Sequence, residues 1–506
     1  MTRPRAPAGP RAMTTELRTE PGRGGRPPAR KVAANSTAQL VTFAFRAAAG
    51  VGVVVLLARD GGPLALGIVQ FALTLSSLLP FYYGVPTLLA REVARRPEEG
   101  RRWVEAGTLL ALLLGGVFTV VLPGAALAVG ADREMVVALA VASLGMAFDG
   151  VARVQFSAFW AWERMELETL VTAVQETAYV VGTAVVLWHG GGPIGALAVF
   201  TASRAVGACG GWLLVGHHLG GPPLPRARRG TLWRTARQCT PFAISDTLTL
   251  TYARFDTVLL GLWKGPVPVG LYQAATNLVL YFNVVPRSIN RALFPRMGRA
   301  WPDRPADFRR LRDLSLRLVA LIGVPVTVGS LLLAPRTISF LYGPSFAAAV
   351  LTYQLLVLVI PVRMVGHTLS LSLAATDRQT RRTVAVTVAA VANVALNCWF
   401  IPRWSYLGAA VTTVICEVGL LVAYAVLLRQ AAGRSQLLRA NGWPLLASVP
   451  MAAVILLTAD QHVLVSAAAG AAVYAAAVVG LALLRARGDR HVRPAQALAA
   501  LVSPTR

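Results

Sequence analysis

Charge is scarce in this sequence. Of 506 residues only 14% are Asp, Glu, Lys or Arg, and 55% are hydrophobic, whereas about a quarter of a typical soluble domain is charged. Cysteine is scarce too, with four residues in the chain. All four lie in or beside apolar runs, without CxxC or zinc-site spacing. We interpret them as small packing residues. These scarcities argue against a soluble domain and against a cysteine-based metal centre.

Long apolar runs occupy most of the chain instead. Runs of 18 or more apolar residues are typical of transmembrane helices. We predict fourteen spans, at residues 37–57, 64–88, 104–128, 135–158, 169–188, 194–215, 240–262, 270–293, 314–334, 347–373, 384–401, 407–428, 443–459 and 462–484. The expected fold is therefore an all-α polytopic membrane protein.

Long loops are missing between these spans. The predicted outer loops have at most about a dozen residues and the inner ones about 25, while folded domains begin near 50 residues. No loop is large enough for a catalytic domain, and no nucleophile–base set, metal cluster or nucleotide loop is evident. We therefore expect a non-enzyme without a bound cofactor or metal, acting inside the membrane.

Acidic residues are outnumbered by basic ones, 23 against 49, which gives a formal net charge of +26. With the N-terminus placed inside, 36 of the 49 fall in inner tails and loops and only five in outer loops. This asymmetry follows the positive-inside rule and predicts that both termini lie in the cytoplasm. The basic residues thus report topology and lipid contact, not nucleic-acid binding.

An internal repeat divides the chain. Five residues of the segment GPLALGIVQFA (62–72) recur in GPVPVGLYQAA (265–275) at an offset of 203. Six spans separate the copies, so both run in the same direction, as in transporters built from parallel repeats. We predict a disordered basic cytoplasmic tail (1–33), a six-span N-lobe (34–220) and a cytoplasmic inter-lobe loop (221–239). A six-span C-lobe (240–430), a final helix pair (431–486) and a cytoplasmic tail (487–506) follow.

Charged residues inside the spans are the candidate functional residues. Facing lipid, each central arginine would cost about 2.5–3.5 kcal/mol, so these residues must face the protein interior or water. Eight arginines in the spans face five acids, and the surplus predicts a cationic cavity suited to phosphate or diphosphate. The candidate ligands are Arg46, Arg254, Arg287, Arg291 and Arg363, and the acids with a coupling or structural role are Asp149, Asp246, Asp256 and Glu417.

Pairing between neighbouring spans is the structural alternative for these acids. Glu176 and Arg204 lie on adjacent spans, and Asp149 could reach Arg46 or Arg153. Each such pair would remove one arginine from the cavity.

Helical geometry separates Arg254 from Asp256. At 100° per residue they lie about 160° apart, so they cannot pair on their own helix. Either could face the cavity, and charge alone favours Arg254.

A polar face is expected on the following span. Asn283, Arg287, Asn290 and Arg291 follow i, i+4, i+7, i+8 spacing, which is typical of a helix face lining a polar path. His367 is a further polar candidate, either proton-linked or simply hydrogen-bonded within the core.

Three segments resemble one family of membrane transporters. They are RFDTVLLGLWKGPVPVGLYQAATNL with the LFPRM that follows (254–297), FLYGPSFAAAV (340–350) and NVALNCWFIPRWSYLGAAVTTVICE (393–417). They are similar to segments of the polysaccharide and oligosaccharide flippases, of the O-antigen and teichoic-acid type, in the multidrug/oligosaccharidyl-lipid/polysaccharide exporter superfamily. The resemblance implies two six-helix lobes that move a polyprenyl-diphosphate-linked oligosaccharide from the inner to the outer leaflet by alternating access, with H⁺ or Na⁺ coupling and partners in polysaccharide biosynthesis.

Four alternatives remain open. A lipid II flippase would use the same diphosphate chemistry, whereas an ion-coupled multidrug exporter would favour an acidic cavity. A membrane-embedded polymerase or glycosyltransferase would need a long outer loop or a nucleotide-sugar domain. A non-transporting scaffold would not explain the net positive charge within the spans.

Overall fold

The computed structural model describes residues 29–78, 84–280, 282, 284–433 and 437–488. Every regular element in these ranges is helical, which confirms the all-α prediction. The helices are α1 (Ala29–Ser77), α2 (Gly84–Arg95), α3 (Gly100–Ala128), α4 (Arg133–Ala161), α5 (Met165–Trp188), α6 (Gly192–His218), α7 (Arg229–Lys264), α8 (Pro266–Leu280), α9 (Val284–Ala300), α10 (Pro305–Tyr342), α11 (Ala349–Val357), α12 (Val359–Ala375), α13 (Gln379–Ala432), α14 (Leu437–Leu457) and α15 (Val463–Gly488), with short 3-10 turns η1 (Pro97–Glu99) and η3 (Pro344–Phe346).

The membrane character of the chain is also confirmed. Nine helical segments in the described ranges are long and apolar enough to cross a membrane. The predicted number of fourteen is not confirmed, partly because α1 and α13 each join two helical arms at one non-helical residue, Gly62 and Ser405. α7, α8 and α9 are not among the nine, because α7 is rich in Thr, Ser and charged residues and the other two are short.

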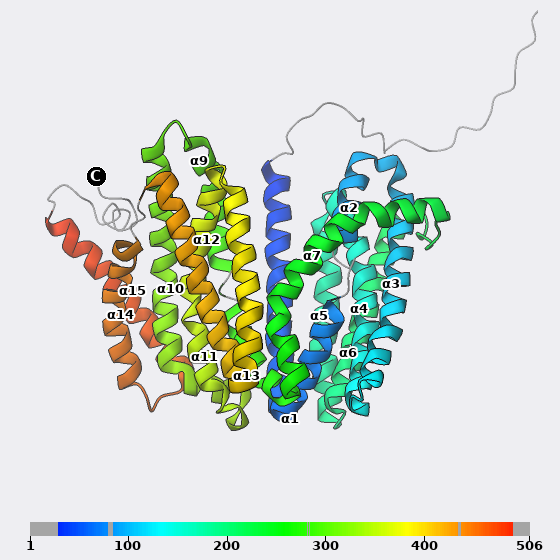
Figure 1. Ribbon diagram of the computed structural model, residues 1–506, viewed down its shortest axis with the longest axis horizontal. Helices are drawn as coiled ribbons and strands as arrows, with labels where there is room; N and C mark the ends of the chain where they lie inside the picture. Colours follow the sequence, from blue (N-terminus) through cyan, green and yellow to red (C-terminus); the bar gives the residue numbers. More distant parts are fainter. Residues whose placement is uncertain (1–28, 79–83, 281, 283, 434–436, 489–506) are drawn as a thin grey trace, which may run out of the picture.

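The helices form two lobes (Figure 1). α1 packs on α4, α5 and α6 in the N-lobe, and its turn at Gly62 brings it against α8. In the C-lobe α12 packs on α9, α10 and α13. α14 packs on α10 and α15 at the outer edge of this lobe, away from the N-lobe.

Two predicted boundaries change in the structure. The inter-lobe loop expected at 221–239 ends early, because α7 already begins at Arg229. Leu232, Ala236 and Cys239 follow i, i+4, i+7 spacing and pack in one apolar cluster with residues of α2 and α3, and burying that stripe favours helix. Figure 1 shows α7 crossing from the N-lobe to the C-lobe. α1 begins within the predicted tail 1–33, whose residues 1–28 lie outside the described part, as do 489–506.

The repeated turns meet at the junction of the lobes. Gly62 and Gly265 both have positive φ, 64° and 81°, and a proline follows each of them. Gly67 and Gly270 lie four residues after these two prolines. A Cβ at Gly67 would lie 1.8 Å from the carbonyl oxygen of Pro266, and a Cβ at Gly270 would lie 2.0 Å from that of Pro63. The two copies of the repeat therefore touch backbone to backbone in reciprocal fashion, which only glycine allows.

Candidate functional site

The N-lobe holds a cluster of paired charges. Arg204 Nη1 lies 2.8 Å from Glu176 Oε1 and 3.7 Å from Asp149 Oδ1, and Arg153 Nε lies 2.7 Å from Asp149 Oδ2. The Arg204 guanidinium also lies over the Phe200 ring, 4.8 Å from its centroid. The anticipated contacts of Glu176 with Arg204 and of Asp149 with Arg153 are thus present in the structure.

Arg46 has a partner that the sequence interpretation missed. Its Nη2 lies 3.5 Å from Glu168 Oε1, with side-chain exposures of 38% for Arg46 and 2% for Glu168. Glu168 also accepts hydrogen bonds from Trp160 Nε1 at 2.6 Å and Gln39 Nε2 at 2.8 Å. It was missed because it lies one residue before the predicted span 169–188. With Glu168 included, three arginines face three acids, so this cluster is balanced rather than cationic.

A polar pocket of about 260 Å³ lies in the C-lobe. α12 contributes Arg363, His367 and Ser370 at i, i+4, i+7 spacing, the second arm of α13 contributes Glu417, and α9 contributes the exposed Arg287. Arg363 Nε lies 2.8 Å from Glu417 Oε1. One carboxylate therefore faces two guanidinium groups, and the pocket carries a surplus positive charge.

Two further groups extend the polar character of this pocket. Arg382 Nε donates a hydrogen bond to Ser370 Oγ at 2.6 Å, which brings a third guanidinium to the pocket wall. His367 Nδ1 is buried and has no hydrogen-bond partner within the described residues.

Arg254 and Asp256 point to different neighbours. Arg254 Nη1 lies 3.4 Å from Thr74 Oγ1 on the second arm of α1. Asp256 accepts hydrogen bonds from the Tyr272 hydroxyl of α8 and, at 2.7 Å, from the backbone N–H of Thr257. Neither residue lines the C-lobe pocket.

The remaining predicted residues are exposed, buried or outside the described part of the chain. Arg291 is exposed on α9. Asn290 is 1% exposed and packs between helices instead of lining a path, with its Nδ2 2.8 Å from Pro286 O and its Oδ1 accepting from Ser315 Oγ at 3.0 Å. Asn283 lies outside the described residues, as does the side chain of Asp246.

The geometry of the C-lobe pocket suits an anion better than a cation. Guanidinium groups on α9 and α12 converge on a small space with a single carboxylate, and arginine binds phosphate oxygens in a bidentate manner. The N-lobe cluster has its charges satisfied internally. Within the part of the chain that the structure describes, the pocket between α9, α12 and α13 is therefore a cationic site.

Two family models match the chain. Residues 29–301 match the family described as "Polysaccharide biosynthesis protein", and residues 256–481 match that described as "Lipid II flippase MurJ". The chain is 28% identical over 170 residues to the "Probable flippase AglR" of Haloferax volcanii, and 26% identical over 103 residues to a Shigella flexneri protein named as an O-antigen transporter. These matches cover 33% and 20% of this chain, and 36% and 24% of the relatives' lengths.

Solved structures share the fold over most of the chain. A "Lipid II flippase MurJ, inward closed conformation" aligns with a TM-score of 0.68 at 15% identity, over 87% of this chain and 97% of the other. An inward-facing MATE-family multidrug transporter of the MOP superfamily aligns with a TM-score of 0.60, also at 15% identity, over 76% and 93%. At such identity the likeness establishes the fold and nothing further.

Proposed function

Because the chain belongs to the polysaccharide biosynthesis protein family, we propose that it is a flippase for a polyprenyl-diphosphate-linked oligosaccharide. It moves the sugar head group from the inner to the outer leaflet by alternating access between its two lobes. No covalent chemistry is needed for this task, because the lipid tail stays in the bilayer while the head follows a hydrated, cationic route.

One observation carries the proposal: the cationic pocket between α9, α12 and α13. Arg287 and Arg363 line it together with the single acid Glu417, which provides the charge that a diphosphate requires. The similarity to AglR, which is named as a flippase, supports the same activity.

The proposal includes an orientation and an energy source. The membrane is a bacterial plasma membrane, and the distribution of arginines supports both termini on its cytoplasmic side. Transport is driven by a proton or sodium gradient, and the partners are enzymes that build and polymerise the glycan. The protein itself needs no cofactor.

The second candidate is lipid II transport. It is favoured by the match of residues 256–481 to the MurJ family, and it uses the same diphosphate recognition. The pocket's surplus positive charge argues against an exporter of organic cations.

The test is a leaflet assay in a host from which the gene has been deleted. Lipid-linked oligosaccharide is extracted after treatment with a membrane-impermeant sugar-modifying reagent. Build-up of protected, inner-leaflet material is expected, and it should be relieved by wild type but not by Arg287→Glu. Arg296→Glu is the matched control, because Arg296 is exposed on the same helix outside the pocket.

The chemical identity of the protected lipid separates the two candidates. Accumulated lipid II identifies the second function, and accumulated polymer precursor identifies the first. Absence of any protected lipid in a strain without a second transporter of this family rejects both.

A further inference from the structure

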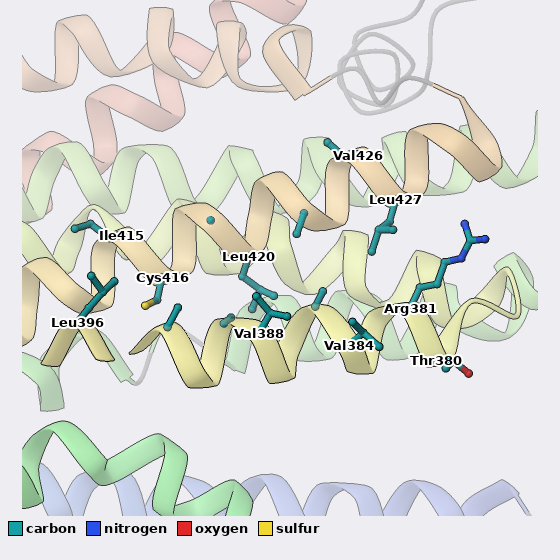
Figure 2. A pocket seen from close by; sticks show the side chains of 15 residues that line it. Thr380, Arg381, Val384, Val388, Leu396, Ile415, Cys416, Leu420, Val426 and Leu427 are labelled. Atoms are coloured by element: carbon teal, nitrogen blue, oxygen red, sulfur yellow. The ribbon is translucent and has the colours of Figure 1, made fainter. Parts of the chain in front are cut away.

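An apolar groove lies between the two arms of α13. The helix turns back at Ser405, and the arms leave a groove of about 710 Å³ between them (Figure 2). Its lining residues are Thr380, Arg381, Val384, Ala385, Val388, Ala389, Ala392, Leu396, Ile415, Cys416, Gly419, Leu420, Ala423, Val426 and Leu427. Apart from Thr380 and Arg381 at one end, the lining is apolar.

Small side chains create the groove. Ala385, Ala389 and Ala392 line it at i, i+4, i+7 on the first arm, and Gly419 and Ala423 line it at i, i+4 on the second. Larger residues at these helical positions would fill the space between the arms. The groove thus has an apolar lining that suits a hydrocarbon chain.

The charged end of the groove is well placed for an anion. Arg381 is exposed, lies at one end of the groove in Figure 2, and makes no ion pair in the part of the chain that the structure describes. From Arg381 to Leu396 the first arm rises about 22 Å, which is most of the roughly 30 Å hydrocarbon core of a bilayer.

The groove and the cationic pocket share a wall. Leu420 lines both, and Cys416 in the groove is followed by Glu417 in the pocket. At the charged end, Arg382 donates to Ser370, which lines the pocket. A lipid whose tail lies in the groove therefore has its charged head beside the entrance to the cationic pocket.

We propose that the α13 groove binds the isoprenoid chain of the polyprenyl-diphosphate carrier, with Arg381 contacting the diphosphate. This inference rests on the proposed function and names the site that holds the lipid tail. A phospholipid presents a single phosphate, whereas a diphosphate-linked sugar presents two phosphates to Arg381 and the adjoining cationic pocket. Keeping the tail on α13 confines the head group to the neighbourhood of the pocket.

Photo-crosslinking tests the site directly. The purified full chain in phosphatidylcholine liposomes is irradiated with a diazirine-tagged polyprenyl diphosphate, and labelled peptides are located by mass spectrometry. We expect label on residues 384–396 and 415–427. Ala389→Phe, which fills the groove, should reduce the label there about tenfold, while Ala395→Phe, on the same arm but outside the groove lining, should leave it unchanged.

Competition identifies the head group. Unlabelled polyprenyl diphosphate should displace the probe, phosphatidylglycerol should not, and Arg381→Gln should weaken the displacement about tenfold, as expected for loss of one charge-assisted contact. Equal displacement by phosphatidylglycerol would mean that the groove binds bulk lipid without selecting the diphosphate, and it would overturn the proposal.

The outcomes also separate this inference from the flippase function. Label confined to pocket residues of α12, such as Val362 and Gly366, would overturn the groove and leave the flippase standing. Label in the groove of a protein whose deletion causes no leaflet defect would support lipid binding there and remove its role in flipping.

Discussion

Replacing Gly270 by alanine should weaken the junction between the lobes. The new Cβ would lie 2.0 Å from Pro63 O, so an ordinary contact near 3.5 Å requires the two helices to separate by about 1.5 Å. The obstacle is backbone, which cannot rotate away as a side chain can. Overpacking costs about 1–3 kcal/mol, and the better helix propensity of alanine returns about 1 kcal/mol. Taking the upper end for a backbone clash, we expect a net loss of about 2 kcal/mol.

The reciprocal contact of the two glycines leads to a second prediction. Gly67→Ala places its Cβ 1.8 Å from Pro266 O, and it should have a similar effect. Once either substitution has separated the helices, the other meets an interface that is already open. The double variant should therefore lose at least about 1 kcal/mol less than the two single losses combined.

The assay is SDS-induced unfolding of the purified protein in mixed micelles, with the free energy of unfolding compared across a double-mutant cycle. Gly116→Ala in α3 is the control, because a Cβ there meets nothing within 4 Å, so it should be neutral or slightly stabilising. The reasoning is refuted if Gly270→Ala is as benign as Gly116→Ala, or if the two junction substitutions are additive.

Three further substitutions probe the other parts of the structure. Glu168→Ala leaves Arg46 without its ion-pair partner and removes a buried acceptor of two other hydrogen bonds, and it should lower the free energy of unfolding by about 3 kcal/mol. Glu417→Gln removes the carboxylate that pairs with Arg363, so crosslinking of a polyprenyl diphosphate at the pocket should increase. Because the pair is partly exposed, the free energy of unfolding should change by less than about 1 kcal/mol. Gly62→Ala places a side chain at φ 64° and ψ −159°, a region essentially limited to glycine, and it should cost about 1–3 kcal/mol. The same SDS titration measures all three free energies. A loss below about 1 kcal/mol for Glu168→Ala, weaker pocket labelling for Glu417→Gln, or an unchanged stability for Gly62→Ala would contradict the respective argument.

The sequence by itself determined the solvent, the helical class and the local geometry of this protein. Run length and helical period are properties of neighbouring residues, so the apolar spans could be found without knowing which helices meet. The same holds for the opposed directions of Arg254 and Asp256, which follow from 100° per residue and reappear as contacts with α1 and α8. The repeat of Gly67 in Gly270 was also visible in the sequence.

Only the tertiary structure decided which faces meet. It paired Arg46 with Glu168 from just outside a span, buried Asn290 between helices, and brought Arg287 and Arg363 together in a pocket of the C-lobe. It also revealed why the repeated glycines exist, as two backbones in reciprocal contact, and opened a groove between the arms of α13. Such features depend on residues far apart in the chain, and a periodic pattern specifies that a face is buried without specifying the partner that buries it.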